Sequence, residues 1–184
     1  MNPSGPFKRV LISEDEIQKR TAELADQINK EFAGETVYIL SILKGSYMFL
    51  AELSKKLNLK TVVDFMVVSS YGNDKVSSGR VRIIKDIYSD LEGKNVIIIE
   101  DIVDTGLTIN FLRDLFKTRG PKSIKVCTML FKKCCYKLEI PPEYVGFEIE
   151  DVFVAGYGLD LEQYYRNVPY VGEVNLDWSM ENDK

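Results

Sequence analysis

Residues 96–99, Val-Ile-Ile-Ile, are the segment that most restricts how this chain can fold. Four successive apolar, β-branched residues favour a β-strand that is buried on both of its faces. A strand of this kind is typical of a parallel sheet with helices on both sides. Further short apolar or β-branched runs predict other strands at 37–42, 61–69, 81–85, 124–130 and 144–149.

Helical patterns lie between these strands. Ser13 and Glu16 form a capping-box pair that predicts a helix from residue 14, and an apolar stripe extends it to about residue 31. Further helices are expected at 45–57 and 108–119. Strands that alternate with helices predict an α/β fold with a mostly parallel sheet flanked by helices. Because no repeat, low-complexity segment or Pro/Ser-rich linker interrupts the 184 residues, we expect one domain, residues 1–184.

The composition argues against several classes of protein. Apolar residues make up 45% of the chain and charged residues 28%, as in soluble globular proteins. The longest apolar run, 47–51, is far shorter than the roughly 20 residues of a membrane helix, and residues 1–10 lack the apolar core of a secretory signal. We therefore expect a cytoplasmic protein without a membrane partner. The net charge of −4 argues against nucleic acid as the main partner.

The chain contains no histidine, which excludes Ser-His and Cys-His nucleophile pairs and zinc sites built on imidazole. Acid–base chemistry must then come from carboxylates, Lys or Tyr. Any metal site must use oxygen ligands, which suit Mg²⁺. Cys127, Cys134 and Cys135 show no metal-type spacing, and the adjacent pair is too close for an ordinary loop-closing disulfide. We expect reduced thiols.

The most informative segment follows the strand at 96–99. Glu100 and Asp101 come directly after it, and Asp104-Thr105-Gly106 with Thr108 leads into the next helix. Glycine lets the backbone approach a ligand closely, and N–H groups at a helix start, together with Thr hydroxyls, suit a phosphate. The two carboxylates could hold sugar hydroxyls directly or a metal through water. Since ligands of open α/β sheets bind at the carboxyl ends of the strands, we expect a sugar-phosphate site here.

Two other interpretations of this segment compete with that one. Asp and Thr are common turn and N-cap residues, so an Asp-Thr-Gly turn alone would indicate only a helix start. A buried strand with a terminal acid also occurs in nucleoside triphosphatases, but the chain has no Gly-x-x-x-x-Gly-Lys-Ser/Thr phosphate loop. Two acids closing a buried strand before this turn favour the sugar-phosphate site.

Residues 96–108 resemble the phosphoribosyl pyrophosphate motif of phosphoribosyltransferases, and the chain from about Lys44 to Tyr170 is similar to their hypoxanthine-guanine branch. The other matching segments are 43–46, 69–73, 146–149, 153–160 and 164–167. The resemblance implies a phosphoribosyltransferase-type sheet in a core of about residues 36–150. It also implies a small hood formed by the chain-terminal segments, about 1–35 and 151–184.

The resemblance implies an enzyme of purine salvage, a pentosyltransferase. It would transfer the 5-phosphoribosyl group from phosphoribosyl pyrophosphate to N9 of hypoxanthine or guanine, giving IMP or GMP and pyrophosphate. Asp104 would be the catalytic acid–base group facing N7 of the purine. The residues implied in binding phosphoribosyl pyrophosphate are Lys44, Gly45, Glu100, Asp101, Asp104, Thr105, Gly106, Leu107, Thr108 and Arg166. Mg²⁺ is the implied cofactor, at Glu100, Asp101 and Asp160.

The matching positions also imply how the base and the lid are built. Lys132 would donate a hydrogen bond to O6, which suits hypoxanthine and guanine but leaves donor facing donor with adenine. Phe153 would stack on the base. The residues implied in purine binding are Lys132, Phe153, Val154, Leu159 and Asp160. Ser70 and Tyr71 would begin a lid loop that excludes water from the ribosyl centre. In the pyrophosphate loop, at Lys44-Gly45, the family has a cis peptide.

Alternatives to this function stay open on the sequence. One is a relative that prefers xanthine or accepts all three 6-oxopurines, because residues 133–136, Lys-Cys-Cys-Tyr, stand where many relatives have proline or arginine. Others are a nucleic-acid-binding regulator on the same fold and a paralogue of low activity. The acidic balance and the presence of Asp104, Lys132 and Arg166 favour catalysis. The family resemblance also implies a homodimer or homotetramer.

Overall fold

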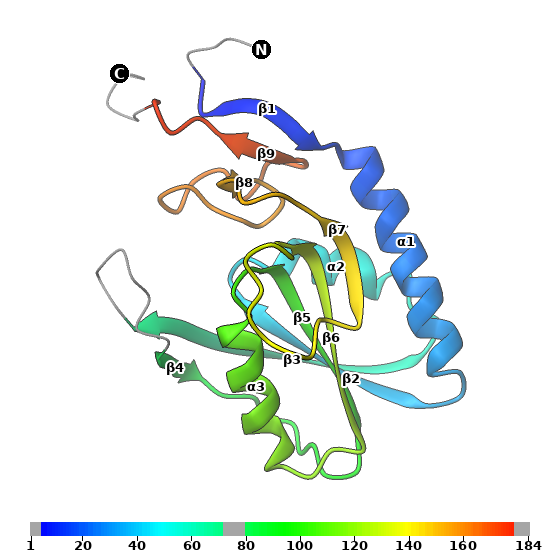
Figure 1. The fold of residues 1–184 in the computed structure, drawn as a ribbon. Coiled ribbons are helices and arrows are strands. Elements are labelled where there is room, and N and C mark those ends of the chain that lie inside the picture. The colour runs from blue at the N-terminus through cyan, green and yellow to red at the C-terminus, as the bar shows by residue number, and fades with distance from the viewer. Residues whose placement is uncertain (1–4, 72–79, 179–184) are drawn as a thin grey trace.

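The structure, a computed structural model, describes residues 5–71 and 80–178. Its centre is a six-stranded sheet with the order β4-β3-β2-β5-β6-β7 (Figure 1). The strands are β2 (Thr36–Leu43), β3 (Lys60–Tyr71), β4 (Arg80–Lys85), β5 (Asn95–Val103), β6 (Ser123–Phe131) and β7 (Tyr144–Glu148). Neighbouring strands are parallel except β3 and β4, which are antiparallel. The predicted mostly parallel α/β fold is confirmed.

The central strand β5 is buried by its neighbours β2 and β6 and by helices on both faces. Residues 96–99 are completely buried, as the run of β-branched residues predicts. The strand is longer than the sequence pattern indicated, because pairing with β6 continues to Val103. Glu100 and Asp101 therefore lie within the strand, close to its carboxyl end, rather than after it.

In the described part of the chain, the sheet is covered by the helices α1 (Glu14–Glu31), α2 (Tyr47–Ser54) and α3 (Leu107–Lys117). The capping box at the start of α1 is confirmed: the Ser13 N–H donates to the Glu16 carboxylate at 2.8 Å, and the Glu16 N–H donates to Ser13 Oγ at 3.4 Å. The helix α2 is shorter than the predicted 45–57, because residues 44–46 form a turn after β2.

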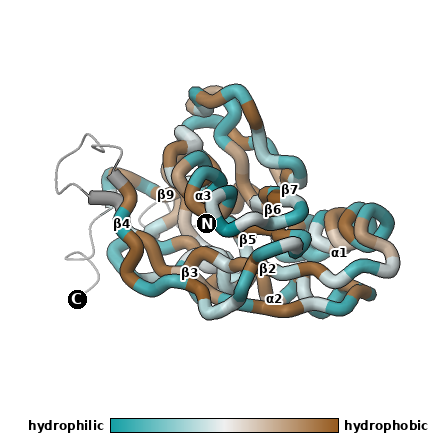
Figure 2. Tube along the Cα trace, turned by 90° about the horizontal axis from the view of Figure 1, so that it is seen from below, coloured by the Kyte–Doolittle hydropathy of each residue, from teal (hydrophilic) through white to brown (hydrophobic). Residues whose placement is uncertain are grey.

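The sheet separates two apolar cores. Ile97 and Ile99 of β5 pack with α1 and α2, whereas Val96 and Ile98, which point to the other face, pack with α3. Figure 2 shows hydrophobic segments where the strands run between α2 and α3. These two layers hold the carboxyl ends of the strands in place, which is where the predicted site lies.

A second, small sheet lies beyond those carboxyl ends (Figure 1). Its order is β1-β9-β8, and its strands β1 (Phe7–Ile12), β9 (Val171–Val174) and β8 (Val154–Ala155) pair antiparallel. The pairing joins the two chain-terminal segments, as the implied hood requires. The helix α1, which falls within the expected hood segment 1–35, packs instead against α2 and β7 of the main core.

Among the described residues, none of the helices combines the length and the apolar character needed to cross a membrane.

Candidate active site

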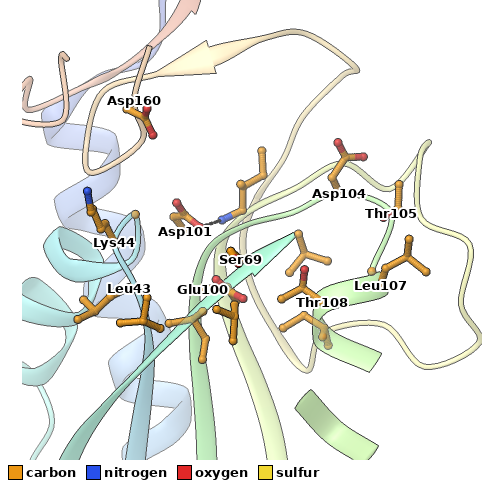
Figure 3. Close-up of a pocket in the computed structure, with 18 of the residues that line it drawn as sticks. Leu43, Lys44, Ser69, Glu100, Asp101, Asp104, Thr105, Leu107, Thr108 and Asp160 are labelled. Atoms are coloured by element: carbon orange, nitrogen blue, oxygen red, sulfur yellow. Dashed lines mark hydrogen bonds between the residues drawn. The ribbon is translucent and has the colours of Figure 1, made fainter. Parts of the chain in front are cut away.

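A cleft of about 640 Å³ opens at the carboxyl ends of β2, β3 and β5. Every residue implied in binding phosphoribosyl pyrophosphate lines it: Lys44, Gly45, Glu100, Asp101, Asp104, Thr105, Gly106, Leu107, Thr108 and Arg166. Figure 3 shows Lys44 and Asp160 on one side, Asp104, Thr105 and Thr108 on the other, and Glu100 and Asp101 between them. The parallel topology thus gathers side chains that are far apart in the sequence.

The two carboxylates on β5 form the floor of this cleft. Glu100 is only 6% exposed. Burial, and then the charge of Asp101, raise the pKa of Glu100 well above its ordinary value. Burial likewise raises the pKa of Asp101 to about 6, against hydrogen bonds from backbone N–H groups that lower it. A cation or sugar hydroxyls at this position would compensate for two poorly solvated acids.

The turn after β2 brings the backbone against Asp101. The peptide bond between Leu43 and Lys44 is cis, one bond before the Lys44–Gly45 position that the resemblance suggested. A Cβ atom at Gly45 would lie 1.5 Å from Oδ2 of Asp101, so no other residue fits here without displacing the carboxylate. Glycine at position 45 is therefore explained by this close approach, rather than by the start of a helix.

The other wall of the cleft is the beginning of α3. Gly106 is the N-cap residue and has a left-handed backbone with φ of +85°, a conformation that favours glycine. A Cβ at this position would also lie 2.4 Å from the Tyr136 ring. The first turn of a helix leaves N–H groups without intrahelical partners. Leu107 and Thr108, in the first turn of α3, line the cleft together with Thr105. This arrangement suits a phosphate group.

Residues 156–166 form the third wall of the cleft, and several of them have a left-handed backbone conformation. Positive φ angles occur at Gly156, Tyr157, Gly158, Glu162, Gln163 and Tyr165. Arg166 donates to the Gly158 carbonyl at 2.8 Å and pairs with Asp160 at 2.6 Å. These contacts hold a guanidinium and a carboxylate at the mouth of the cleft, where a charged leaving group could be bound.

Lys132 follows β6 and lies beside the cleft rather than in its lining. It is 8% exposed, and its N–H donates to the Val103 carbonyl at 2.9 Å. Its ammonium nitrogen lies 2.9 Å from an Asp151 oxygen and 3.8 Å from an Asp104 oxygen. An almost buried lysine with two acidic neighbours differs from an ordinary surface lysine, whereas Lys133 is exposed.

The remaining residues implied in purine binding lie further from the phosphate side. Phe153 is 51% exposed, which leaves its ring accessible for stacking. Val154 is buried in β8, and Leu159 packs against the main core, so neither side chain lines the cleft. Asp160 does line it. The residues implied in binding phosphoribosyl pyrophosphate thus all line one cleft, whereas of the residues implied in purine binding Asp160 alone is in that lining.

Ser70 and Tyr71, the implied start of the lid, are the last residues of β3 and pair with Val81 and Arg80 of β4. Ser69, just before them, lines the cleft. The rest of the expected lid loop, residues 72–79, lies outside the described residues.

The carboxylates of the cleft bear on whether the site can hold Mg²⁺. Within residues 5–71 and 80–178, no group of three or more Cys, Asp or Glu residues could hold a metal by itself. The poorly solvated Glu100 and Asp101 nevertheless offer hard oxygen ligands on the floor of the cleft, and Asp160 offers another on the side of Lys44 (Figure 3). Mg²⁺ commonly keeps few protein ligands and takes the rest from water and substrate phosphates, so these residues fit it.

Two residues at the site were not anticipated from the sequence. Gln163 accepts hydrogen bonds from Lys44 at 3.1 Å and from Arg166 at 3.4 Å, and thereby links two walls of the cleft. Asp151 holds the ammonium group of Lys132. Neither residue stands in a distinctive pattern, because both act through chain segments that only the fold brings together.

Known proteins resemble this chain over most of its length. The model of the phosphoribosyl transferase domain family matches residues 13–162. The chain is 48% identical to a hypoxanthine-guanine phosphoribosyltransferase of Bacillus subtilis over 90% of this chain and 92% of that protein. Among solved structures, a hypoxanthine-guanine phosphoribosyltransferase of Bacillus anthracis superposes with a TM-score of 0.88 at 44% identity, covering 92% and 99% of the two chains.

A hypoxanthine phosphoribosyltransferase of Staphylococcus aureus has a similar structure, with a TM-score of 0.90 at 42% identity and 94% of each chain covered. Family match, identity and fold agree over most of the length. This chain therefore belongs to the phosphoribosyltransferase family.

Proposed function

We propose that this protein is a purine-salvage enzyme that transfers the 5-phosphoribosyl group of phosphoribosyl pyrophosphate to N9 of hypoxanthine or guanine. The observation that carries the proposal is the position of Lys132, whose ammonium nitrogen is 3.8 Å from a carboxylate oxygen of Asp104, the first residue of the turn 104–108. A donor for a 6-oxo group and an acid–base group for N7 thus stand together beside a sugar-phosphate cleft.

The phosphate and sugar are bound by three elements. The turn 104–108 and the first N–H groups of α3 hold the 5′-phosphate, because N–H groups at the start of a helix and threonine hydroxyls donate hydrogen bonds to an anion. Glu100 and Asp101 face the ribose hydroxyls. The turn at Lys44 and Gly45 and the guanidinium of Arg166 bind the pyrophosphate. Mg²⁺, when bound with the pyrophosphate, supplies charge neutralisation of the leaving group.

The reaction needs little covalent chemistry from the protein. The bond to pyrophosphate breaks as the glycosidic bond forms, and the ribosyl centre carries positive charge in the transition state. The carboxylates of Glu100 and Asp101 favour that charge electrostatically. Asp104 accepts the proton from N7 as N9 bonds to the ribose, a step worth roughly 10²–10⁴ in rate. No enzyme-bound covalent intermediate is required.

Lys132 selects the base. Its ammonium group donates only, so it matches the acceptor at position 6 of hypoxanthine, guanine and xanthine. Phe153 offers an exposed ring for stacking, and the backbone at Val154 reads the edge of the base. Both hypoxanthine and guanine are therefore proposed substrates, and adenine is not.

A test of this proposal is the identity of the product. The protein would be incubated with phosphoribosyl pyrophosphate, MgCl₂ and hypoxanthine or guanine, and the nucleotide identified by chromatography and by NMR of its glycosidic linkage. We expect IMP or GMP linked through N9, formed with one pyrophosphate per nucleotide, and no product when EDTA replaces MgCl₂. Release of ribose 5-phosphate without nucleotide would contradict the proposal.

We also propose that the enzyme is cytoplasmic and forms a homodimer or homotetramer. Large apolar side chains are exposed on β3 and β4 and just after them, at Val62, Val63, Phe65, Ile84 and Tyr88, which is the support for self-association. Sedimentation equilibrium should give a mass of two or four chains, and a single-chain mass would contradict this part of the proposal.

A further inference from the structure

The adjacent residues Cys134 and Cys135 lie in the turn after β6, between Lys132 and Tyr136. Cys134 is exposed and Cys135 half-buried, and their sulfur atoms are 3.6 Å apart. This distance is far beyond the roughly 2.05 Å of a disulfide bond. It is close to the separation of about 3.8 Å that two sulfurs have when both bind one ion at about 2.3 Å in tetrahedral geometry.

This dithiol is connected to the purine side of the site. Lys132, which precedes the pair in the same turn, holds Asp151 and thereby lowers the pKa of that carboxyl. Asp151 in turn accepts from Lys132 at 2.9 Å. The Cys135 N–H also donates to the Lys132 carbonyl at 3.0 Å, so the turn itself joins the thiol to the lysine.

We propose that Cys134 and Cys135 form a binding site for a thiophilic ligand that bonds both sulfurs at once, and that its occupation weakens purine binding through Lys132. The chemical class is a trivalent arsenical or a soft metal ion of similar size. The coupling to the purine rests on the proposed function of Lys132, whereas the dithiol site itself does not.

The reaction with an arsenical is balanced without an oxidant. An aryl arsenic(III) oxide forms two As–S bonds with the two thiols, its As–O bonds break, and the oxygen leaves as water with both thiol protons. Arsenic stays trivalent. Contact with Cys134, burial and the neighbouring carboxylates raise the pKa of Cys135 to about 12, and because the thiolate is the attacking form, the adduct should form faster at higher pH.

A ligand that bonds both sulfurs fixes their positions, and the hydrogen bond from the Cys135 N–H to the Lys132 carbonyl transmits this change to the lysine. The expected effect is a rise of about 3- to 10-fold in the KM for hypoxanthine, the range for loss of one hydrogen bond. The kcat and the dissociation constant of phosphoribosyl pyrophosphate should change less than about twofold, because their residues lie on other walls of the cleft.

The experiment uses phenylarsine oxide as the probe and intact-protein mass spectrometry as the first readout. Wild-type protein should gain one phenylarsenic group per chain, removable by ethanedithiol but not by an equal concentration of a monothiol. Cys134→Ser and Cys135→Ser should gain none at the same concentration, although both retain the buried Cys127. An adduct of equal stability on either variant would overturn the dithiol site.

The second readout tests the coupling. With phenylarsine oxide present, wild-type protein should show the raised KM for hypoxanthine, whereas Cys135→Ser, which cannot bond the reagent through two sulfurs, should keep the KM that it has without reagent. A stable adduct with an unchanged KM would overturn the coupling. Absence of turnover in unreacted wild-type protein would instead contradict the proposed function, while the mass measurement would still decide whether the dithiol site exists.

Discussion

The ammonium nitrogen of Lys132 lies 3.8 Å from a carboxylate oxygen of Asp104. Asp104 belongs to the turn between β5 and α3, and Lys132 follows the neighbouring strand β6. Because β5 and β6 are parallel and in register up to Val103 and Phe131, the residues after them must emerge side by side. The proposed acid–base group and the proposed base-selecting group are therefore fixed relative to each other by the sheet.

Asp104→Asn should lower kcat by roughly 10²–10⁴ while leaving the affinity for phosphoribosyl pyrophosphate within a few-fold of wild type. The amide has nearly the same shape but cannot accept the N7 proton. Steady-state kinetics and calorimetric titration measure the two effects. Asp114→Asn, the same change at an exposed position on α3, is the matched control, and it should alter neither kcat nor the affinity for phosphoribosyl pyrophosphate. Equal turnover in Asp104→Asn would remove this residue from the acid–base role.

Lys132→Ala should weaken purine binding roughly 10- to 100-fold, the range for a hydrogen bond from a charged donor. Binding of phosphoribosyl pyrophosphate should weaken much less, because Lys132 lies outside the lining of the cleft. Titration of each ligand separates the two effects, and Lys133→Ala changes an exposed neighbour as the control. A larger loss for the sugar phosphate than for the purine would refute the assignment.

Gly45→Ala should reduce the affinity for phosphoribosyl pyrophosphate roughly tenfold or more. The added Cβ would lie 1.5 Å from Asp101 Oδ2, so the carboxylate or the turn must move. Gly34→Ala is the control, because that glycine has a left-handed backbone but no atom within 4 Å of an added Cβ. The control should lose only stability. Unaltered affinity in Gly45→Ala would show that the turn does not bind the pyrophosphate.

The pKa of Asp101, raised to about 6, predicts how stability depends on pH without Mg²⁺. Between about pH 4 and 6 the folded protein holds a proton on this carboxyl that the unfolded chain has lost. The contribution to the free energy of unfolding is therefore present at low pH, declines as pH rises through this window, and is flat above it.

Asp101→Asn should remove this decline, so its stability relative to wild type should increase from pH 4 to 6.5 in EDTA. Urea unfolding at a series of pH values measures the difference. Adding MgCl₂ and phosphoribosyl pyrophosphate to wild-type protein should stabilise it most above pH 6, where the carboxylate is free to bind. Identical pH profiles for the two proteins would contradict the raised pKa.

Local chemistry explains which parts of this fold the sequence predicted. The run at 96–99 and the Ser13–Glu16 capping box act through neighbouring residues, so both predictions were confirmed. The strand β1 was missed because its partner, β9, lies more than 150 residues away and its exposure pattern lacks a strict alternation. The end of β5 was placed too early because acids at 100 and 101 suggest a strand end, although pairing with β6 continues.

The candidate site divides in the same way. A phosphate site at residues 104–108 could be predicted because these residues are consecutive and combine glycine and threonine at the start of a helix. The contacts of Gln163 and Asp151 were not, since each depends on how a distant segment is folded over the cleft. The requirement for glycine at 45 is likewise visible only from the position of Asp101 on another strand.

The most direct test of the account is pyrophosphate release by wild-type protein with phosphoribosyl pyrophosphate, Mg²⁺ and, separately, hypoxanthine, guanine, xanthine and adenine. We expect turnover with hypoxanthine and guanine that exceeds turnover with adenine by at least about 100-fold, because adenine leaves the Lys132 donor unpaired. Adenine turnover equal to that of hypoxanthine, or no turnover with any base despite binding of phosphoribosyl pyrophosphate, would contradict it.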